Sequence, residues 1–177
     1  MQVHYHPAGR EGADKTQLGI WFADSARIRH RLINIPVVNT EFIIPAGAVN
    51  YEVPAKLQLP PGKIVTVIPH MHNLGRQIKV EVEDRDGTKR PVIYIDNWDF
   101  NWQGSYTPVN PVSIPFGSTV RVTCVFDNSA GNPKNPNNPI VPVGWGERTS
   151  DEMAVALIGV IFDNEAVLQL PFGAGGK

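Results

Sequence analysis

The chain has 177 residues, enough for one large domain with a sizeable hydrophobic core. Sixteen basic and 17 acidic residues leave a net charge of −1, so no bulk field favours binding to nucleic acid or to an anionic membrane. No apolar stretch approaches the roughly 20 residues that a helix needs to span a bilayer, and the single cysteine, Cys124, excludes a disulfide within the chain.

Short strand-like runs predict an all-β chain. The first run, Gln2-Val3-His4-Tyr5, already resembles a strand and carries no signal peptide, so we expect the sequence to be a piece of a longer protein. The 16 prolines and 16 glycines divide the rest into runs that lack a 3.6-residue period. In chain order, the further strand candidates are 17–23, 27–34, 41–44, 49–55, 63–68, 77–84, 91–96, 119–126 and 152–162.

Two of these runs alternate with a period of two, which is typical of half-buried strands. One apolar face is expected to hold Ile78, Val80 and Val82, and the other to hold Val120, Val122, Cys124 and Phe126. The last run, 152–162, is apolar on both faces and is expected to be a central strand. Short strands separated by Pro- and Gly-rich turns predict an antiparallel β-sandwich or jelly roll.

Two other segments could carry a function. The aromatic stretch 94–106 contains Trp98 and Trp102, and it forms either a packed corner between two sheets or the lining of a cleft. The Asn- and Pro-rich segment 127–152 is too long for a simple hairpin, and loops of this length are usually functional or disordered. Trp145 in this segment either covers a nearby site or anchors the loop.

His70 and His72 form an H-x-H pair in an otherwise apolar run. Residues two apart on a strand face the same side, so the two imidazoles would project together while Met71 faces away. Such a pair can share one metal ion, or it can simply form hydrogen bonds to loops at the end of a strand. A third ligand would have to come from elsewhere; the candidates are His4, His6, His30, the carboxylates and the three methionines.

Four motifs occur in an order that resembles a known enzyme family. QVHYH, HMHNLGR, PFGSTVRVTCVF and TSDEMAVALI resemble the copper type II, ascorbate-dependent monooxygenases, whose members include peptidylglycine alpha-hydroxylating monooxygenase and dopamine beta-monooxygenase. The resemblance covers nearly the whole chain and is strongest to the family's C-terminal half. It implies a copper domain over residues 17–172, a remnant of the preceding domain over 1–16 and a disordered tail over 173–177.

The resemblance also implies a ligand set. His70, His72 and Met153 would bind the catalytic copper, where dioxygen is activated. A soft thioether favours Cu(I), and zinc rarely takes such a ligand. His4 would belong to a second copper that delivers electrons and whose other ligands come from the absent amino-terminal domain. The fragment is therefore expected to be inactive alone.

Other positions near these ligands qualify the resemblance. Asp151 and Glu152 are expected either to orient the ligand strand or to form caps and turns. Peptide-hydroxylating members have an arginine and a tyrosine where this chain has Ile68 and Leu157, and an apolar pair cannot clamp a carboxylate. Cys124 corresponds to a family cysteine whose disulfide partner is missing, so we expect a buried thiol.

The resemblance implies an oxidoreductase that uses copper, dioxygen and ascorbate to hydroxylate a C–H bond of a small molecule. It further implies an amino-terminal domain of the same protein as a partner, and a periplasmic or extracellular location. Two alternatives remain open. One is a non-catalytic copper-binding or copper-handling β-domain, and the other is a metal-free β-sandwich that binds a glycan or a protein through residues 94–106 or 127–150.

Overall fold

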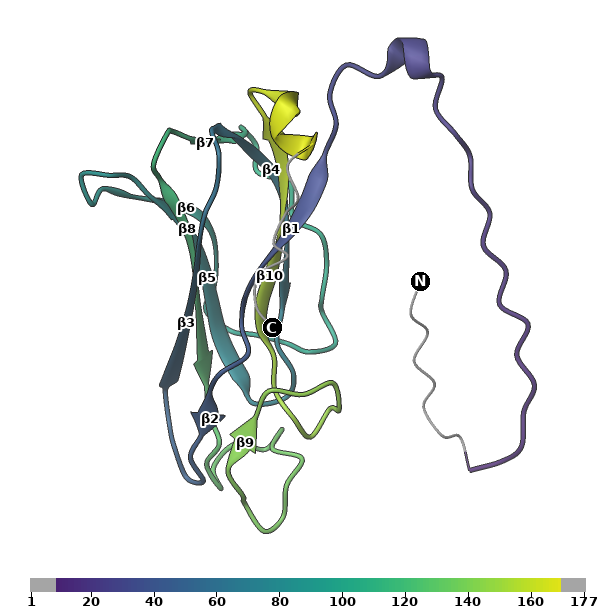
Figure 1. The fold of residues 1–177 in the computed structure, drawn as a ribbon. Coiled ribbons are helices and arrows are strands. Elements are labelled where there is room, and N and C mark those ends of the chain that lie inside the picture. The colour runs from purple at the N-terminus through teal and green to yellow at the C-terminus, as the bar shows by residue number, and fades with distance from the viewer. Residues whose placement is uncertain (1–8, 170–177) are drawn as a thin grey trace.

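A computed structural model describes residues 9–169 as two four-stranded antiparallel sheets that face each other (Figure 1). The first sheet has the order β1 (Ile33–Asn39), β10 (Ala154–Phe162), β4 (Gly62–His70), β7 (Val112–Ile114). The second has the order β3 (Tyr51–Gln58), β8 (Thr119–Phe126), β5 (Gly75–Glu83), β6 (Lys89–Ile95). The predicted all-β sandwich is confirmed, while the jelly-roll connectivity stays a prediction.

The remaining elements are short. Strands β2 (Ile43–Ile44) and β9 (Val143–Gly144) form a separate antiparallel pair, and the 3-10 helices are η1 (Ser25–Arg27) and η2 (Glu165–Gln169). Within residues 9–169, no helix is long and apolar enough to cross a membrane.

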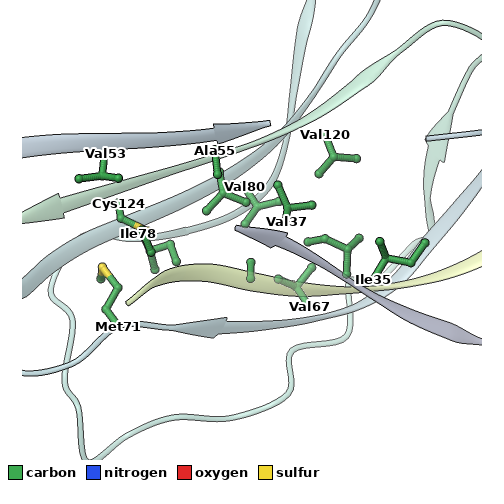
Figure 2. Close-up of a cluster of buried hydrophobic side chains, with 14 of the residues drawn as sticks. Ile35, Val37, Val53, Ala55, Val67, Met71, Ile78, Val80, Val120 and Cys124 are labelled. Carbon is green, nitrogen blue, oxygen red and sulfur yellow. The ribbon is translucent and has the colours of Figure 1, made fainter. Parts of the chain in front are cut away.

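The core lies between the two sheets and follows the alternation expected from the sequence. Every apolar residue predicted for the inner faces of β5 and β8 is fully buried: Ile78, Val80, Val82, Val120, Val122, Cys124 and Phe126. Figure 2 shows several of them packed with residues of β1, β3 and β4. Burying each such side chain stabilises the fold by about 1.5–3 kcal/mol. Burial also raises the pKa of the Cys124 thiol, so this cysteine behaves as a core residue.

Strand β10 is central, as predicted, because β1 pairs with one edge and β4 with the other. Its inner face alternates with an outer face that is only half-buried. The segment thus places one row of residues in the core and presents the other row to the outside.

The strands predicted at 17–23 and 27–34 are wrong, except that β1 begins at Ile33. Residues 9–32 run outside the sandwich, with η1 as the only regular element (Figure 1). Trp21 and Phe22 are 89% and 92% exposed. An apolar run forms a strand only where a neighbour completes its ladder, and within the described residues the first ladder starts with Ile33 opposite Val160. The strand-like run at residues 2–5 and the tail at 173–177 lie outside the described residues.

The long segment 127–152 is tied to the sandwich by a buried asparagine. The Asn128 side chain has no exposed surface, and its amide donates to the carbonyls of Ile44, Pro45 and Val141. Asn135 donates to its oxygen at 3.0 Å. Strand β9, which no pattern in the sequence predicted, adds the ladder with β2. The segment therefore has its own hydrogen-bonded structure.

Candidate metal centre

The two histidines lie at the end of β4, where its alternation carries one of them outward. Pro69 and Met71 are buried, and Met71 lies in the core beside Cys124 in Figure 2. His70, the last residue of β4, therefore faces outside, and His72 follows in the turn to β5. The two imidazole rings meet edge to face, with their centroids 5.0 Å apart.

Met153 reaches the same place from the other end of the chain. It lies just before β10, and Val155, two residues later, stands opposite His70 in the ladder. Since residues two apart on an extended segment share a side, Met153 lies on the face of His70. One pocket of about 320 Å³ is lined by His70, His72, Phe100, Gln103, Glu147, Thr149 and Met153.

Of the other histidine candidates, only His30 lies within the described residues. His30 lies in the exposed segment after η1 and lines a different pocket, with Ser25 and Glu165. His4 and His6 lie outside the described residues. The structure thus assembles the two histidines of the H-x-H pair with Met153.

Gln103 fixes the tautomer of His70. The Gln103 amide donates to the carbonyl of Phe100 at 2.7 Å, so its oxygen is the atom that faces Nδ1 of His70. Nδ1 must therefore carry the hydrogen, which leaves the Nε2 lone pair free. Burial lowers the pKa of His70, Gln103 opposes this, and nearby His72 lowers it further, so the neutral form is favoured.

The backbone of Asp151 fixes the tautomer of His72 in the same way. Nδ1 of His72 lies 3.0 Å from the carbonyl oxygen of Asp151, which can only accept a hydrogen bond. Nδ1 therefore donates, and in the tautomer that this bond selects the lone pair is on Nε2. The Phe100 ring packs edge to face against His72, with the centroids 5.8 Å apart. Both imidazoles are thus held in the form in which Nε2 can bind a metal.

Glu152 joins the histidine turn to the methionine segment. Its carboxylate is fully buried and accepts the backbone N–H groups of His72 at 2.8 Å, Leu74 at 2.6 Å and Met153 at 3.2 Å. Burial raises the pKa of Glu152 to about 7, against the opposing effect of these donors. Asn73 adds a second link by donating to the carbonyl of Thr149 at 3.2 Å.

Different residues of the aromatic stretch 94–106 take the two roles expected for it, packing and lining a cleft. Trp98 is buried and donates from Nε1 to the carbonyl of His72 at 3.2 Å, so it stabilises the turn between β4 and β5. Phe100 lines the pocket, whereas Trp102 is 77% exposed. Trp145 is not among the pocket's lining residues, but its backbone bridges to Glu152, which anchors the loop.

The donor set fits a soft, monovalent copper ion better than other common metals. Two histidines and a methionine line one pocket, and a thioether sulfur favours Cu(I). Across residues 9–169, no three side chains of His, Cys, Asp or Glu gather in a way that could hold a metal ion. A centre here would therefore need the methionine, and the sequence alone offered no spacing that predicts this convergence.

Three pocket residues were not predicted as functional. Glu147 and Thr149 are exposed and lie in the irregular segment before Met153, where no periodic pattern marks them. Phe100 lies in the aromatic stretch 94–106, where nothing in the sequence distinguishes it from the other aromatic residues. Their closeness in sequence to Met153 or to Gln103 is the one feature that could have drawn attention to them.

Comparison with known proteins agrees with the geometry. The family model of the copper type II ascorbate-dependent monooxygenase, C-terminal domain, matches residues 33–163. This range begins with the first residue of β1 and ends just after β10, so it spans the whole sandwich. A search of curated proteins finds no match. The chain belongs to the copper type II ascorbate-dependent monooxygenase family, and residues 33–163 are its C-terminal domain.

Proposed function

We propose that His70, His72 and Met153 bind one copper ion, and that this domain, as part of a longer chain, takes part in hydroxylating a C–H bond of a small molecule with dioxygen and ascorbate. The observation that carries the proposal is the fixed tautomer of both histidines: each donates from Nδ1, so each presents a free Nε2 in a pocket shared with Met153. Family membership supports copper and ascorbate as cofactors.

The chain's own residues have three tasks in this proposal. Gln103 and the Asp151 carbonyl orient the imidazoles, and the Glu152 carboxylate holds the turn and the methionine segment together. Phe100 shields one side of His72 from water. A copper ion bound there would supply the one-electron chemistry with dioxygen that protein side chains lack.

The proposal extends to the protein's partners and location. His4 would bind a second copper together with ligands from an amino-terminal domain of the same protein. The description of the matched domain as C-terminal supports the presence of such an amino-terminal domain, and the ligand role of His4 rests on the resemblance of the sequence motifs alone. A periplasmic or extracellular location also follows from family membership rather than from any feature of the sandwich. Residues 1–16 would belong to the preceding domain, and residues 17–172 to this one.

Titration with Cu(I) against a competing chelator tests the ligand set. We expect His72→Ala and Met153→Ala each to lower the Cu(I) affinity at least tenfold, because each removes one donor from the pocket. His30→Ala is the matched control, since His30 lies in a different pocket, and it should bind as the wild type does. Unchanged affinity in both ligand variants would contradict the assignment.

A copper-handling domain without turnover would use the same ligands, so affinity alone does not separate it from an oxygenase. Oxygen uptake by the copper-loaded protein with ascorbate, measured on a chain that includes the amino-terminal domain, makes the distinction. The monooxygenase proposal requires uptake that Met153→Ala abolishes. Tight copper binding without uptake would support the copper-handling role instead.

A further inference from the structure

The outer face of the first sheet continues directly from the pocket. Residues that stand directly opposite each other in an antiparallel ladder share a face. Val155 stands opposite both His70 and Val38, while Leu157 stands opposite both Ile68 and Pro36. Two rows therefore cross β4, β10 and β1 side by side: His70–Val155–Val38 and Ile68–Leu157–Pro36.

This outer face is apolar and accessible. Apart from His70, the two rows contain only aliphatic residues; Val155, Leu157 and Ile68 are half-buried, and Val38 is 38% exposed. No charged side chain stands in either row. An ion bound here would lose its hydration without gaining a charged or hydrogen-bonding partner. The binding of a hydrocarbon would instead be stabilised by about 25 cal/mol for each Å² of apolar surface buried.

Polar contacts mark the limits of this apolar face on two sides. Along the edge of β4, the Ser105 hydroxyl meets that of Thr66 at 2.7 Å, and Tyr106 exchanges backbone hydrogen bonds with Val67. The next row of the ladder contains Thr66 opposite Gly159, where the Thr66 side chain fills the space of the missing Cβ. The apolar area is thus a defined platform that begins at His70.

The pocket itself also disfavours an anionic ligand. Among residues 9–169, Glu147 is the one carboxylate that lines the pocket, and no lysine or arginine of this part of the chain does so. A substrate carboxylate near His70 would meet a like charge at Glu147 and no lysine or arginine with which to form an ion pair.

We propose that the substrate is an uncharged, apolar molecule that lies across Ile68, Leu157, Val155 and Val38 beside His70. The proposal rests on the proposed function, since it names the substrate class of that same site. Apolar contact supplies the affinity, and the extension of the platform from His70 directs one end of the molecule into the pocket.

Three probes of similar shape and different charge test the substrate class: propylbenzene, phenethylammonium and 3-phenylpropionate. Binding is measured by NMR titration of the copper-free and the Cu(I)-loaded protein. We expect propylbenzene to bind at least tenfold more tightly than either ion. Tighter binding of 3-phenylpropionate would overturn the proposal, as would tighter binding of phenethylammonium that Glu147→Gln abolishes.

Substitutions on the platform test whether propylbenzene binds there. Leu157→Asp should weaken propylbenzene binding at least tenfold and leave the Cu(I) affinity unchanged. Val38→Asp, at a more exposed position on the edge strand β1, provides a second variant that the fold tolerates more readily. The control is Val109→Asp, at a residue that is 98% exposed. Unweakened binding in both folded platform variants would overturn the proposal.

The same titrations separate this proposal from the ligand assignment. Met153→Ala should lose Cu(I) affinity and keep propylbenzene binding. If the wild type binds propylbenzene but no copper, the apolar platform stands and the oxygenase function fails. If it binds copper but not propylbenzene, the function stands and the substrate class proposed here is wrong.

Discussion

The buried carboxylate of Glu152 accepts the backbone N–H of His72 at 2.8 Å, across 80 residues of sequence. The same carboxylate accepts the N–H groups of Leu74 and Met153. One side chain therefore sets the distance between the turn that carries a histidine and the segment that carries the methionine. The convergence at the candidate metal centre therefore combines this link with the β4–β10 ladder, in which Val155 stands opposite His70.

Glu152→Gln should destabilise the protein and weaken copper binding together. An amide has one acceptor atom in place of two, so at least one buried N–H loses its partner, at a cost of about 1–3 kcal/mol in the free energy of unfolding. Urea unfolding and Cu(I) titration measure the two effects. Glu147→Gln, at the exposed carboxylate of the same pocket, is the control and should change the stability by less than about 0.5 kcal/mol.

Gln103→Leu should weaken Cu(I) binding with little change in stability. It removes the acceptor that holds the Nδ1–H of His70, and loss of such an outer partner typically costs about 10–100-fold in metal affinity. Gln103 is exposed, so the free energy of unfolding should stay close to that of the wild type. Gln103→Glu retains an acceptor and should restore most of the affinity. Equal affinity in the leucine and glutamate variants would remove Gln103 from the site.

The sequence predicted best those features that a local pattern determines. Alternation along 77–84 and 119–126 identified the inner faces, because a half-buried strand must place every second side chain in the core. The same rule placed His70 and Met71 on opposite sides. It failed at 17–23, where an apolar run satisfies the composition of a strand but has no neighbour among the described residues.

The links within the site were harder to predict because they join segments far apart in the chain. Gln103 and His70 are 33 residues apart, and nothing in the spacing of either marks the other. Met153 was identified only through the family resemblance, since core packing is the usual role of a methionine. A glutamate before it could equally have been a surface residue, and only the fold reveals that Glu152 is buried with three backbone donors.

Asn128→Ala should loosen the segment 127–152. Three backbone carbonyls lose the donor that ties them together, and we expect the free energy of unfolding to fall by about 1–3 kcal/mol. Trypsin should then cleave after Lys134 faster than in the wild type, as limited proteolysis followed by mass spectrometry would detect. Asn110→Ala, at an exposed position, is the control. Cleavage at the wild-type rate would show that other contacts hold the segment.

Asp84 should make the stability depend on pH in the acid range. The Arg90 guanidinium donates two hydrogen bonds to this carboxylate and Ser118 donates one, which hold the pKa of Asp84 below its usual value of 3.8. The stabilisation is therefore complete above that value and is lost as the pH falls through the lower, folded-state pKa. Urea unfolding at pH 7 and pH 3 should show that Asp84→Asn differs from the wild type less at the lower pH. An equal difference between Asp84→Asn and the wild type at the two pH values would contradict this role of Asp84.

Gly159 and Thr66 should behave as a coupled pair, because they stand opposite each other between β10 and β4. A Cβ at position 159 would overlap Cγ2 of Thr66 and approach Oδ1 of Asn34 to 3.0 Å, so Gly159→Ala should cost about 1–3 kcal/mol in the free energy of unfolding. Thr66→Ser removes Cγ2 but keeps the hydroxyl that meets Ser105. The double variant should therefore recover most of the lost stability, which a double-mutant cycle in urea measures as a coupling energy. Purely additive effects would mean that the overlap with Asn34, or a shift of the backbone, limits this position instead.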